Sequence, residues 1–390
     1  MRVFPSARLS AFLASTVVVG LCMSPALAQN TFETRAEHAV IMDYETGEIL
    51  FDLNGDVALP PASMSKLMTV LMLLEAIDDG RLSLDDTLPV SENAWRRGGA
   101  ASGSSTMFLE VNSRARVEDL LRGIIIQSGN DACIVVAEAL SGSEEAFARD
   151  MTDRAHELGL TSASFANSTG WPHPDHRISA EDLAELARII IRDHPDHYGI
   201  WAERSFTHNG ITQRNRNPLL GVMPDADGLK TGHTEESGYG LVGTAVRDGE
   251  RRIIVFNGME SNSARADEAE RMMRAALNDF DIYDLFEAGA DVGETAAVFM
   301  GVSDTVSLRV SDDVAVGMHR RARRGLTVAV EYEGPLQAPV MEGDVVGALV
   351  VEIPGEATRR YPVEAADTVE KKGLMGRIGT ALAHLIRGDL

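Results

Sequence analysis

The spacing of hydrophobic and polar residues divides the chain into a long mixed part and a shorter strand-rich part. Between residues 37 and 280, short runs of β-type residues alternate with segments whose apolar positions recur every three or four residues. The first spacing predicts strands and the second predicts helices. Because the strands stand at both ends of this part and the helices between them, we expect an antiparallel sheet with helical layers.

The expected elements can be given by residue number. The predicted helices span residues 63–74, 117–126, 132–140, 144–158, 183–192 and 264–280. The predicted strands span residues 38–42, 48–51, 206–209, 211–214, 228–232, 239–246 and 252–259, and Asp248-Gly249 is a strong hairpin turn between the last two. Residues 96–105, which are rich in glycine, serine and alanine, and residues 167–176 are expected to be loops.

The pattern changes near Phe286, where short β-type runs with turns between them replace the helical spacing. These runs span residues 296–300, 305–310, 326–332 and 345–353. Their number and length predict a small all-β domain of about 80 residues.

The last segment has a third pattern. Its apolar residues Leu374, Met375, Ile378, Leu382, Leu385 and Ile386 share one helical stripe, and Lys371, Lys372, Arg377 and Arg387 form a basic face. An amphipathic helix with a basic face is typical of a segment that lies on an anionic membrane surface. The alternative is a terminal helix that packs on the body of the protein.

The amino end has the features of a secretory leader. Arg2 and Arg8 precede the apolar run 9–23, and Ala26-Leu27-Ala28 is a small-x-small cleavage site. We therefore expect four segments: a signal peptide at 1–28, a catalytic domain at 29–285, a β-rich domain at 286–368 and an amphipathic helix at 369–390.

Composition excludes some classes of function. The formal net charge of −23 makes the chain a poor nucleic-acid binder. Loss of the leader removes Cys22 and leaves only Cys133, so we expect no internal disulfide and interpret Cys133 as a buried, inert thiol. His173, His176 and His233 lack the spacing of metal ligands, and we expect neither a metal nor another cofactor.

The stretch Pro61-Ala62-Ser63-Met64-Ser65-Lys66 stands at the start of an otherwise apolar helix. Ser63 and Lys66 are three residues apart and therefore share one face of its first turn. Desolvation lowers the pKa of a lysine, so a neutral amine there can take a proton from the neighbouring hydroxyl. This S-x-x-K motif alone is common, and taken alone it would be better explained by a helix cap with a chance lysine.

Two further motifs change that interpretation. Ser128-Gly129-Asn130 stands between two predicted helices, and Lys230-Thr231-Gly232 lies in a predicted strand. The three motifs together, in this order, resemble those of the penicillin-recognising serine enzymes. Their surroundings, which include Asp131, Cys133, His233 and Thr234, are similar to those of the low-molecular-mass penicillin-binding proteins of the peptidase S11 family, the penicillin-binding protein 5/6 type. The resemblance covers most of the mature chain.

This resemblance implies an α/β (α+β) penicillin-recognising fold of the transpeptidase and β-lactamase type, and a D-alanyl-D-alanine carboxypeptidase that trims peptidoglycan pentapeptides. Ser63 would attack the carbonyl between two D-alanines and form an acyl-enzyme, with Lys66 as general base. Ser128 would relay a proton to the leaving nitrogen. Asn130 would hold the substrate amide and fix the amine of Lys66.

The third motif would bind the substrate. Lys230 and Thr231 would face the terminal carboxylate, and Gly232 would leave room for the peptide along the strand edge. By resemblance, the backbone N–H of His233 would complete the oxyanion hole with that of Ser63. Arg216 matches a family arginine near the pocket, although a surface ion pair is an equal alternative.

The resemblance also implies partners and an address: peptidoglycan stem peptides, β-lactam antibiotics, and a periplasmic position on the anionic inner-membrane surface through the terminal helix. Asp182 matches a family acid that supports the pocket, and its alternative is a charge at a helix start. Three other activities remain open. A D,D-endopeptidase on crosslinked peptidoglycan would share every motif. A class A β-lactamase would need a glutamate in the segment 167–182, where no clear candidate stands. A non-catalytic cell-wall-binding protein would not need the full set of motifs.

Overall fold

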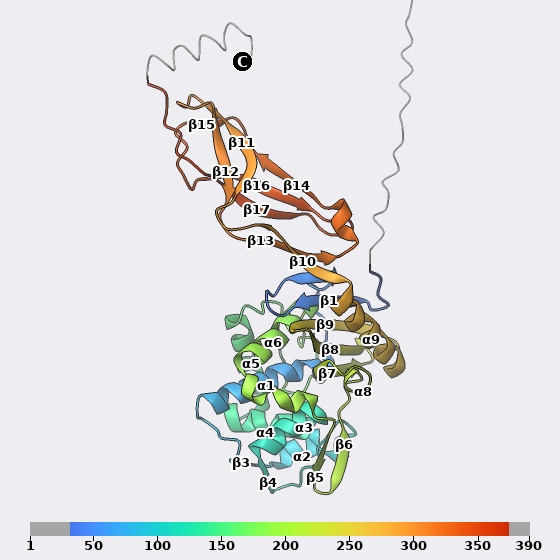
Figure 1. Ribbon diagram of the computed structural model, residues 1–390. Helices are drawn as coiled ribbons and strands as arrows, with labels where there is room; N and C mark the ends of the chain where they lie inside the picture. The colour runs from blue at the N-terminus through green and yellow to red at the C-terminus, as the bar shows by residue number, and fades with distance from the viewer. Residues whose placement is uncertain (1–31, 374–390) are drawn as a thin grey trace, which may run out of the picture.

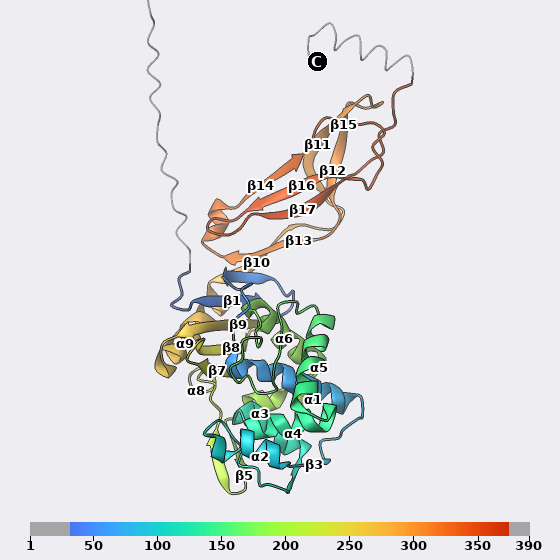
Figure 2. The same cartoon turned by 180° about the vertical axis from the view of Figure 1, so that it is seen from behind.

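The computed structural model describes residues 32–373 (Figure 1). The expected signal peptide at 1–28 and the stripe from Leu374 onward therefore lie outside the described residues. The described chain forms two units, which we call the body (residues 32–279) and the β-rich unit (residues 280–373). In both views they are stacked end to end (Figures 1 and 2).

The body is built on an antiparallel five-stranded sheet, as the sequence predicts. Its spatial order is β2 (Ile49–Leu53), β1 (His38–Asp43), β9 (Glu250–Met259), β8 (Gly238–Arg247) and β7 (Ala226–Thr234). Along β9, Ile253 and Val255 face one core, and Ile254 and Phe256 face the other. This period of two means that both faces of the sheet are covered. β7 forms one edge of the sheet.

Helices cover the two faces unequally. α9 (Asn262–Asn278) packs on one face, and the larger helical layer lies on the other (Figure 1). The larger layer contains the 3-10 turn η1 (Ala62–Ser65), α1 (Lys66–Asp78), α2 (Glu92–Gly98), the 3-10 turn η2 (Ala100–Ser102), α3 (Val117–Ile126), α4 (Asn130–Ser141), α5 (Glu144–Glu157) and α6 (Ala180–Asp193). α1 is buried along almost its whole length and forms the centre of this layer.

Short elements complete the body. They are the ladder of β3 (Thr87–Pro89) with β4 (Arg114–Arg116), the hairpin of β5 (Ser205–His208) with β6 (Ile211–Arg214), and the helical turns α7 (Pro195–Tyr198), η3 (Gly199–Ala202) and α8 (Leu219–Val222). The β5–β6 hairpin matches the predicted one and precedes α8 and β7 in the chain.

Two predictions of local structure were wrong. The segment 96–105 is not a loop throughout, because Arg96 and Arg97 belong to α2. The Oγ of Ser91 caps the start of α2 by accepting a hydrogen bond from the N–H of Ala94 at 2.9 Å. Gly98 allows α2 to lie directly against the start of α4, since a Cβ there would stand 2.3 Å from a backbone nitrogen. The helix predicted to reach residue 280 ends at Asn278, because Phe280 pairs with His319 in a strand.

The β-rich unit contains two sheets. β10 (Phe280–Phe286) pairs with β13 (Val314–His319). The larger sheet has the order β14 (Thr327–Tyr332), β16 (Val345–Glu352), β17 (Arg359–Ala365), β12 (Thr305–Val310), β11 (Asp291–Phe299) and β15 (Leu336–Gln337). The sequence predicts β11, β12, β14 and β16 and misses β10, β13, β15 and β17. The strand-rich structure begins at Phe280 rather than near Phe286.

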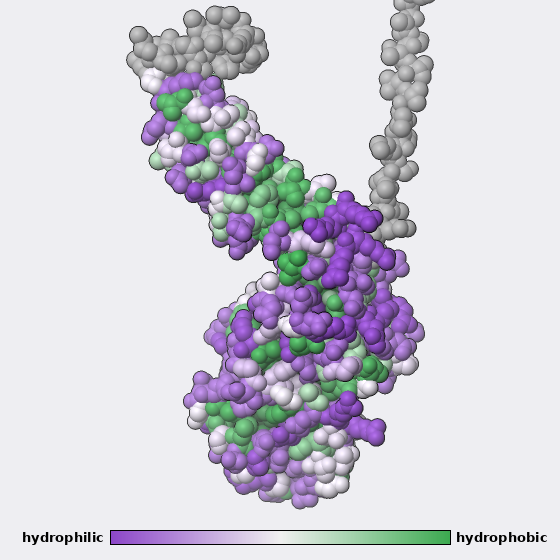
Figure 3. Space-filling model, viewed as in Figure 1, coloured by the Kyte–Doolittle hydropathy of each residue, from purple (hydrophilic) through white to green (hydrophobic). Residues whose placement is uncertain are grey.

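The two units meet where β13 lies against β2. The N–H of Gly317 donates to Glu48 at 3.2 Å, and Arg359 forms an ion pair with the same carboxylate. Gly317 lets the strands approach, because a Cβ there would stand 2.3 Å from the buried side chain of Leu50. On the visible surface, hydrophobic side chains gather over β14 and β16 between mostly hydrophilic areas (Figure 3).

The end of the described chain is extended. The N–H of Val369 donates to the carbonyl of Val340 at 2.8 Å, and that of Lys372 donates to the carbonyl of Met300 at 2.8 Å. The terminal helix therefore does not begin at Val369, as we expected, because these residues pair with the β-rich unit. Within residues 32–373, no helix has both the length and the apolar character needed to cross a bilayer.

Candidate active site

The hydroxyl of Ser63 and the amine of Lys66 meet at the junction of η1 and α1. Lys66 Nζ donates to Ser63 Oγ at 2.8 Å, with Lys66 fully buried and Ser63 half-buried. The residue before the serine, Ala62, has φ of +51°, a left-handed conformation that a non-glycine residue adopts only under constraint. The turn thus presents Ser63 at the surface of the core and keeps Lys66 inside it.

The surroundings of Lys66 favour its neutral form. Burial lowers the pKa of Lys66 to about 8, and the positive charge of Arg216 acts in the same direction. The Lys66 amine also donates to the backbone carbonyl of Thr169. Since a carbonyl accepts from the amine in either protonation state, the remaining lone pair of a neutral amine can take a proton from Ser63.

Ser128 and Lys230 form a second hydroxyl–amine pair. Lys230 reaches from the edge strand β7 and donates to Ser128 Oγ at 3.0 Å and to the carbonyl of Thr231 at 3.1 Å. Ser128 lies in the turn between α3 and α4 with φ of +60°. Burial, followed by the charge of Lys66, lowers the pKa of Lys230 well below its usual value.

Asn130 makes different contacts from those predicted. Its side-chain N–H group donates to Ser104 Oγ at 3.0 Å, and its backbone N–H donates to the carbonyl of Ser105 at 2.8 Å. Within residues 32–373 its Oδ1 is buried without a hydrogen-bond partner. The predicted contact between Asn130 and the amine of Lys66 is therefore wrong for this state, and Oδ1 is left as an acceptor for a ligand N–H.

The strand β7 closes the site on the side of the sheet. Gly232 lies against the start of η1, because a Cβ there would stand 2.8 Å from the carbonyl oxygen of Pro61. Thr231 is buried beside Lys230, and the ring of His233 stacks on Tyr239 at 3.8 Å between centroids. Gly232 thus allows β7 to lie close to the Ser63 turn. The sequence analysis predicted only that it leaves room for the substrate peptide.

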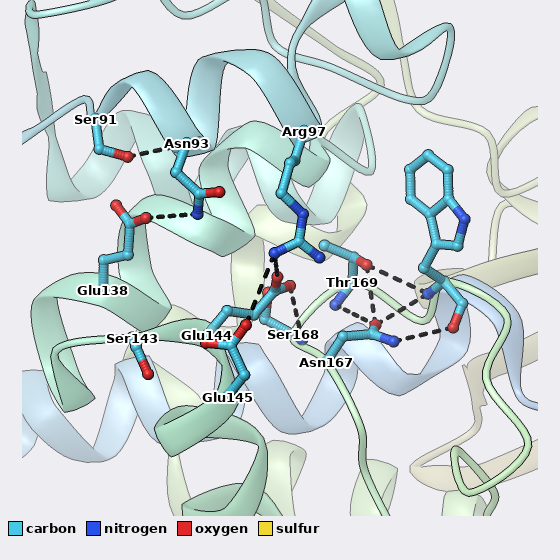
Figure 4. A network of polar contacts seen from close by, with 12 residues as sticks. Ser91, Asn93, Arg97, Glu138, Ser143, Glu144, Glu145, Asn167, Ser168 and Thr169 are labelled. Carbon is cyan, nitrogen blue, oxygen red and sulfur yellow. Dashed lines mark hydrogen bonds and ion pairs between the residues drawn. The ribbon is translucent and has the colours of Figure 1, made fainter.

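The sequence analysis predicted the loop 167–176 but missed that its Thr169 carbonyl accepts from Lys66. Asn167 Oδ1 accepts hydrogen bonds from the backbone N–H groups of Thr169 at 3.1 Å, Gly170 at 2.8 Å and Trp171 at 3.0 Å. Figure 4 shows the contacts between Asn167 and Thr169 in this loop. The carbonyl of the same Thr169 accepts from Lys66. Gly170 has φ of +78°, and a Cβ there would overlap the carbonyl of Ala62. The cluster Asn167-Ser168-Thr169-Gly170 is a turn signal within this loop.

A buried carboxylate supports the same loop. Glu144, at the start of α5, is 4% exposed and accepts from the backbone N–H of Ser168 at 3.2 Å and from its hydroxyl at 2.8 Å. Its other oxygen pairs with Arg97 of α2 at 3.0 Å (Figure 4). Glu144 therefore ties the loop next to Lys66 to two helices.

Asp131 fixes the opposite wall. Its buried carboxylate accepts from Thr106 Oγ1 at 2.6 Å and from the backbone N–H groups of Met107 and Leu109, both at 3.0 Å. These contacts hold the segment that carries Ser104 and Ser105. Arg216 Nη1 donates to Ser105 Oγ at 2.6 Å, so this arginine lies at the rim of the site.

Two other expected residues have structural positions. The carboxylate of Asp182 accepts from the N–H of Ser162 at 2.8 Å and from its hydroxyl at 2.5 Å, so it fixes the start of the preceding loop rather than touching the site. Cys133 is fully buried, and burial raises the pKa of its thiol to about 12. The thiol is therefore protonated at neutral pH, as expected of an inert core residue.

Comparisons with known proteins agree with this geometry. Residues 25–261 match the Peptidase_S11 family, described as D-alanyl-D-alanine carboxypeptidase, and residues 280–371 match the penicillin-binding protein 5, C-terminal domain. D-alanyl-D-alanine carboxypeptidase DacC of Escherichia coli (strain K12) is 34% identical, over 90% of this chain and 89% of that protein.

Solved structures show the same architecture. Penicillin-binding protein 5 from Haemophilus influenzae superimposes with a TM-score of 0.66 and 33% identity, covering 87% of this chain and 99% of that one. The D-alanyl-D-alanine carboxypeptidase DacD from Francisella tularensis gives a TM-score of 0.74 and 28% identity, covering 92% and 98%.

Proposed function

Because this chain belongs to the D-alanyl-D-alanine carboxypeptidase family, peptidase S11, we propose that its Ser63 is the nucleophile that removes the terminal D-alanine from peptidoglycan pentapeptides. The protein is a serine D-alanyl-D-alanine carboxypeptidase of peptidoglycan metabolism. The observation that carries the residue assignment is the 2.8 Å contact between Ser63 Oγ and a buried Lys66 whose pKa burial lowers to about 8.

Acylation in this proposal involves a proton transfer to Lys66 and another to the leaving nitrogen. Ser63 Oγ attacks the carbonyl carbon of the penultimate D-alanine while its proton passes to the neutral amine of Lys66. When the C–N bond breaks, the leaving nitrogen needs a proton. Ser128 is suited to supply it and to regain a proton from the Lys66 ammonium, which becomes neutral again, because its hydroxyl both donates and accepts. Ser128 Oγ lies 3.0 Å from Lys230 Nζ, which holds it in place. Water later hydrolyses the ester on Ser63.

Binding uses the groups around the pair. The buried, unpartnered Oδ1 of Asn130 is suited to accept an N–H of the substrate. Lys230, Thr231 and Arg216 surround the place of the terminal carboxylate. The backbone N–H groups of Ser63 and His233 form the oxyanion hole in this proposal, and one such donor lowers the barrier by roughly 3 kcal/mol. A β-lactam, whose strained amide mimics the scissile one, would acylate the same hydroxyl.

We also propose a cellular location for the enzyme. Residues 1–28 direct export and are removed, and the amphipathic stripe from Leu374 onward rests on the anionic periplasmic face of the inner membrane. The catalytic domain then begins at residue 29, and its boundary with the β-rich domain falls at Phe280, where β10 starts, rather than at 286. Truncation after Gly373 leaves the Val369 pairing intact and should move the protein from the membrane to the soluble fraction. An unchanged membrane fraction would rule out the anchor.

One assay tests the catalytic proposal. Purified mature protein is incubated with disaccharide pentapeptide and with crosslinked muropeptide dimers, and free D-alanine is scored against separated strands. We expect D-alanine release by the wild type and none above background by Ser63→Ala. The variant should keep the wild-type melting temperature, because Ser63 is half-buried and its hydroxyl makes no backbone contact within residues 32–373. Release or penicillin labelling that survives the substitution would identify another nucleophile.

A further inference from the structure

Four arginines line one open cleft beside the catalytic groups. Arg204, Arg214, Arg216 and Arg265 contribute to a cavity of about 710 Å³, and its other lining residues are uncharged. The chain as a whole has a formal net charge of −23. A positive cleft in an acidic protein focuses the field and attracts anions.

These arginines differ from most others in the described chain because no carboxylate pairs with them. Arg204 and Arg214 are exposed and form no ion pair within residues 32–373. Arg216 donates to the hydroxyl of Ser105, and Arg265 donates to the carbonyl of Gly232 and to the side chain of Asn262, all neutral acceptors. By contrast, Arg251 and Arg252 pair with aspartates.

Arg265 is the most informative of the four. It is 6% exposed, and within the described residues its Nε is buried without a hydrogen-bond partner. Burial lowers the pKa of Arg265 to about 10. Its partners among the described residues are two neutral oxygen acceptors and the ring of Tyr239, whose centroid is 5.5 Å away. An unpaired buried cation is costly, so the position favours an anion in the cleft.

The cleft continues the catalytic site on one side. Arg265 Nη1 lies 3.3 Å from the carbonyl oxygen of Gly232, next to Thr231. Arg216 contacts Ser105, whose carbonyl accepts from the N–H of Asn130. Arg204 and Arg214 lie farther out, at the open end of the β5–β6 hairpin, where Ser205 pairs with Arg214. The row of charges therefore starts where the terminal carboxylate is proposed to bind and extends away from it.

We propose that the outer part of this arginine cleft, at Arg204 and Arg214, is a second anion subsite, which binds carboxylates of the second stem peptide in a crosslinked peptidoglycan dimer. The inference rests on the proposed function, because a pentapeptide ends at the carboxylate held by Lys230 and Thr231, and nothing in it extends past that group. In a crosslinked dimer, a second stem takes the place of the leaving D-alanine, and its further carboxylates reach Arg204 and Arg214. Guanidinium groups bind carboxylates through paired hydrogen bonds.

The test uses a double variant and a matched control. Arg204→Gln with Arg214→Gln removes the two outer charges, both exposed, without touching the proposed catalytic groups. Arg149→Gln with Arg324→Gln removes two other exposed arginines that have no ion pair in the described part of the chain and do not line the cleft. For each protein, kcat/KM is measured on disaccharide pentapeptide and on the crosslinked dimer, together with the rate of acylation by benzylpenicillin.

We expect the dimer to lose roughly 10- to 100-fold in kcat/KM in the Arg204/Arg214 variant, as for the loss of one or two charge-assisted hydrogen bonds. Pentapeptide hydrolysis and penicillin acylation should stay within about twofold, and the control variant should match the wild type. An equal loss on pentapeptide and dimer, or no loss on the dimer, would overturn the subsite. So would a wild-type protein that neither cleaves the dimer nor is competitively inhibited by it. Failure of the proposed function would show differently, as a wild-type protein that benzylpenicillin does not acylate.

Discussion

The body and the β-rich unit treat buried polar groups in opposite ways. The body buries Lys66, Lys230, Asn130 and Glu144 completely or almost completely, whereas His319 is the single buried polar side chain that the structure describes in the β-rich unit. There, charges lie at the surface in pairs such as Arg360 with Glu331, at 2.7 Å. The β-rich unit thus follows the rule for a stable fold, whereas the body buries polar and charged side chains at several places, the site among them.

The two buried lysines differ from buried charges such as Arg252, which pairs with Asp43. Neither Lys66 nor Lys230 has a carboxylate within ion-pair distance in the described residues, and each donates to a serine and a carbonyl. Buried, unpaired amines destabilise a fold and acquire lowered pKa values, and both effects suit a proton acceptor. The difference teaches that the two buried lysines serve the reaction and lower the stability of the fold. Each prediction below tests that contrast.

The largest effect is expected from Lys66→Met, which keeps the length of the side chain and removes the amine. The rate of acylation by benzylpenicillin should fall by about 10³-fold, because general base catalysis typically contributes 10²–10⁴. The melting temperature should be equal or higher, since an apolar side chain replaces a buried, unpaired amine. Stopped-flow acylation and calorimetry measure the two quantities. A large loss of stability with little loss of rate would reverse the interpretation.

The next effect concerns pH. Lys66 must be neutral to accept the proton, and burial lowers its pKa to about 8. The fraction of neutral amine rises as pH increases through 8, so the acylation rate should increase tenfold per unit below that value and level off above it. At pH 6 we expect roughly one hundredth of the plateau rate. A rate that is flat between pH 6 and 9 would exclude Lys66 as the base.

A smaller effect is expected from Glu144→Gln, which weakens the support of the loop beside Lys66. Acylation should slow by roughly tenfold, because hydrogen bonds to buried charged groups are worth about 1.5–3 kcal/mol and here they position the Thr169 carbonyl. Glu145→Gln is the matched control, since its carboxylate is exposed and lies as far as 4.0 Å from Arg97. Because the carbonyl sets the environment of Lys66, the pH profile should shift in Glu144→Gln alone. An unshifted profile would mean that Glu144 serves stability only.

The smallest effect is expected at the junction of the two units. Glu48→Ala removes the hydrogen bond to Gly317 and the ion pair with Arg359. Since both partners are partly exposed, we expect a loss of about 1 kcal/mol in the free energy of unfolding and no change in acylation rate. A change of more than about twofold in acylation would show that the β-rich unit acts on the site.

The sequence predicts the elements with a clean period. The strands β1, β8 and β9 and the helices α3 and α6 were predicted to within three residues at each end. The strands are apolar runs, and each of the two helices has one face that is apolar at a constant spacing. β10 was missed because Phe280 continues the helical spacing of α9, and only its pairing with β13 shows that it is a strand. β17 was missed because it contains Pro362 and two arginines at its start.

The contacts of the site also divide into those that local spacing predicts and those that it does not. Ser63 and Lys66 stand in a local motif, so their contact follows from helical spacing. Lys66 and Thr169 are 103 positions apart, and no local spacing predicts that the amine would meet a backbone carbonyl rather than Asn130. Such contacts depend on how loops fold over the core, which is decided by packing and not by the period of the sequence.

The central claim is that Ser63 becomes acylated, and it can be observed directly. The purified protein is incubated with benzylpenicillin, quenched and digested, and the mass-shifted peptide is sequenced by tandem mass spectrometry. We predict one adduct per chain, located on Ser63 and absent from Lys66→Met at the same reaction time. An adduct on another residue, or none on the wild type, would contradict the account.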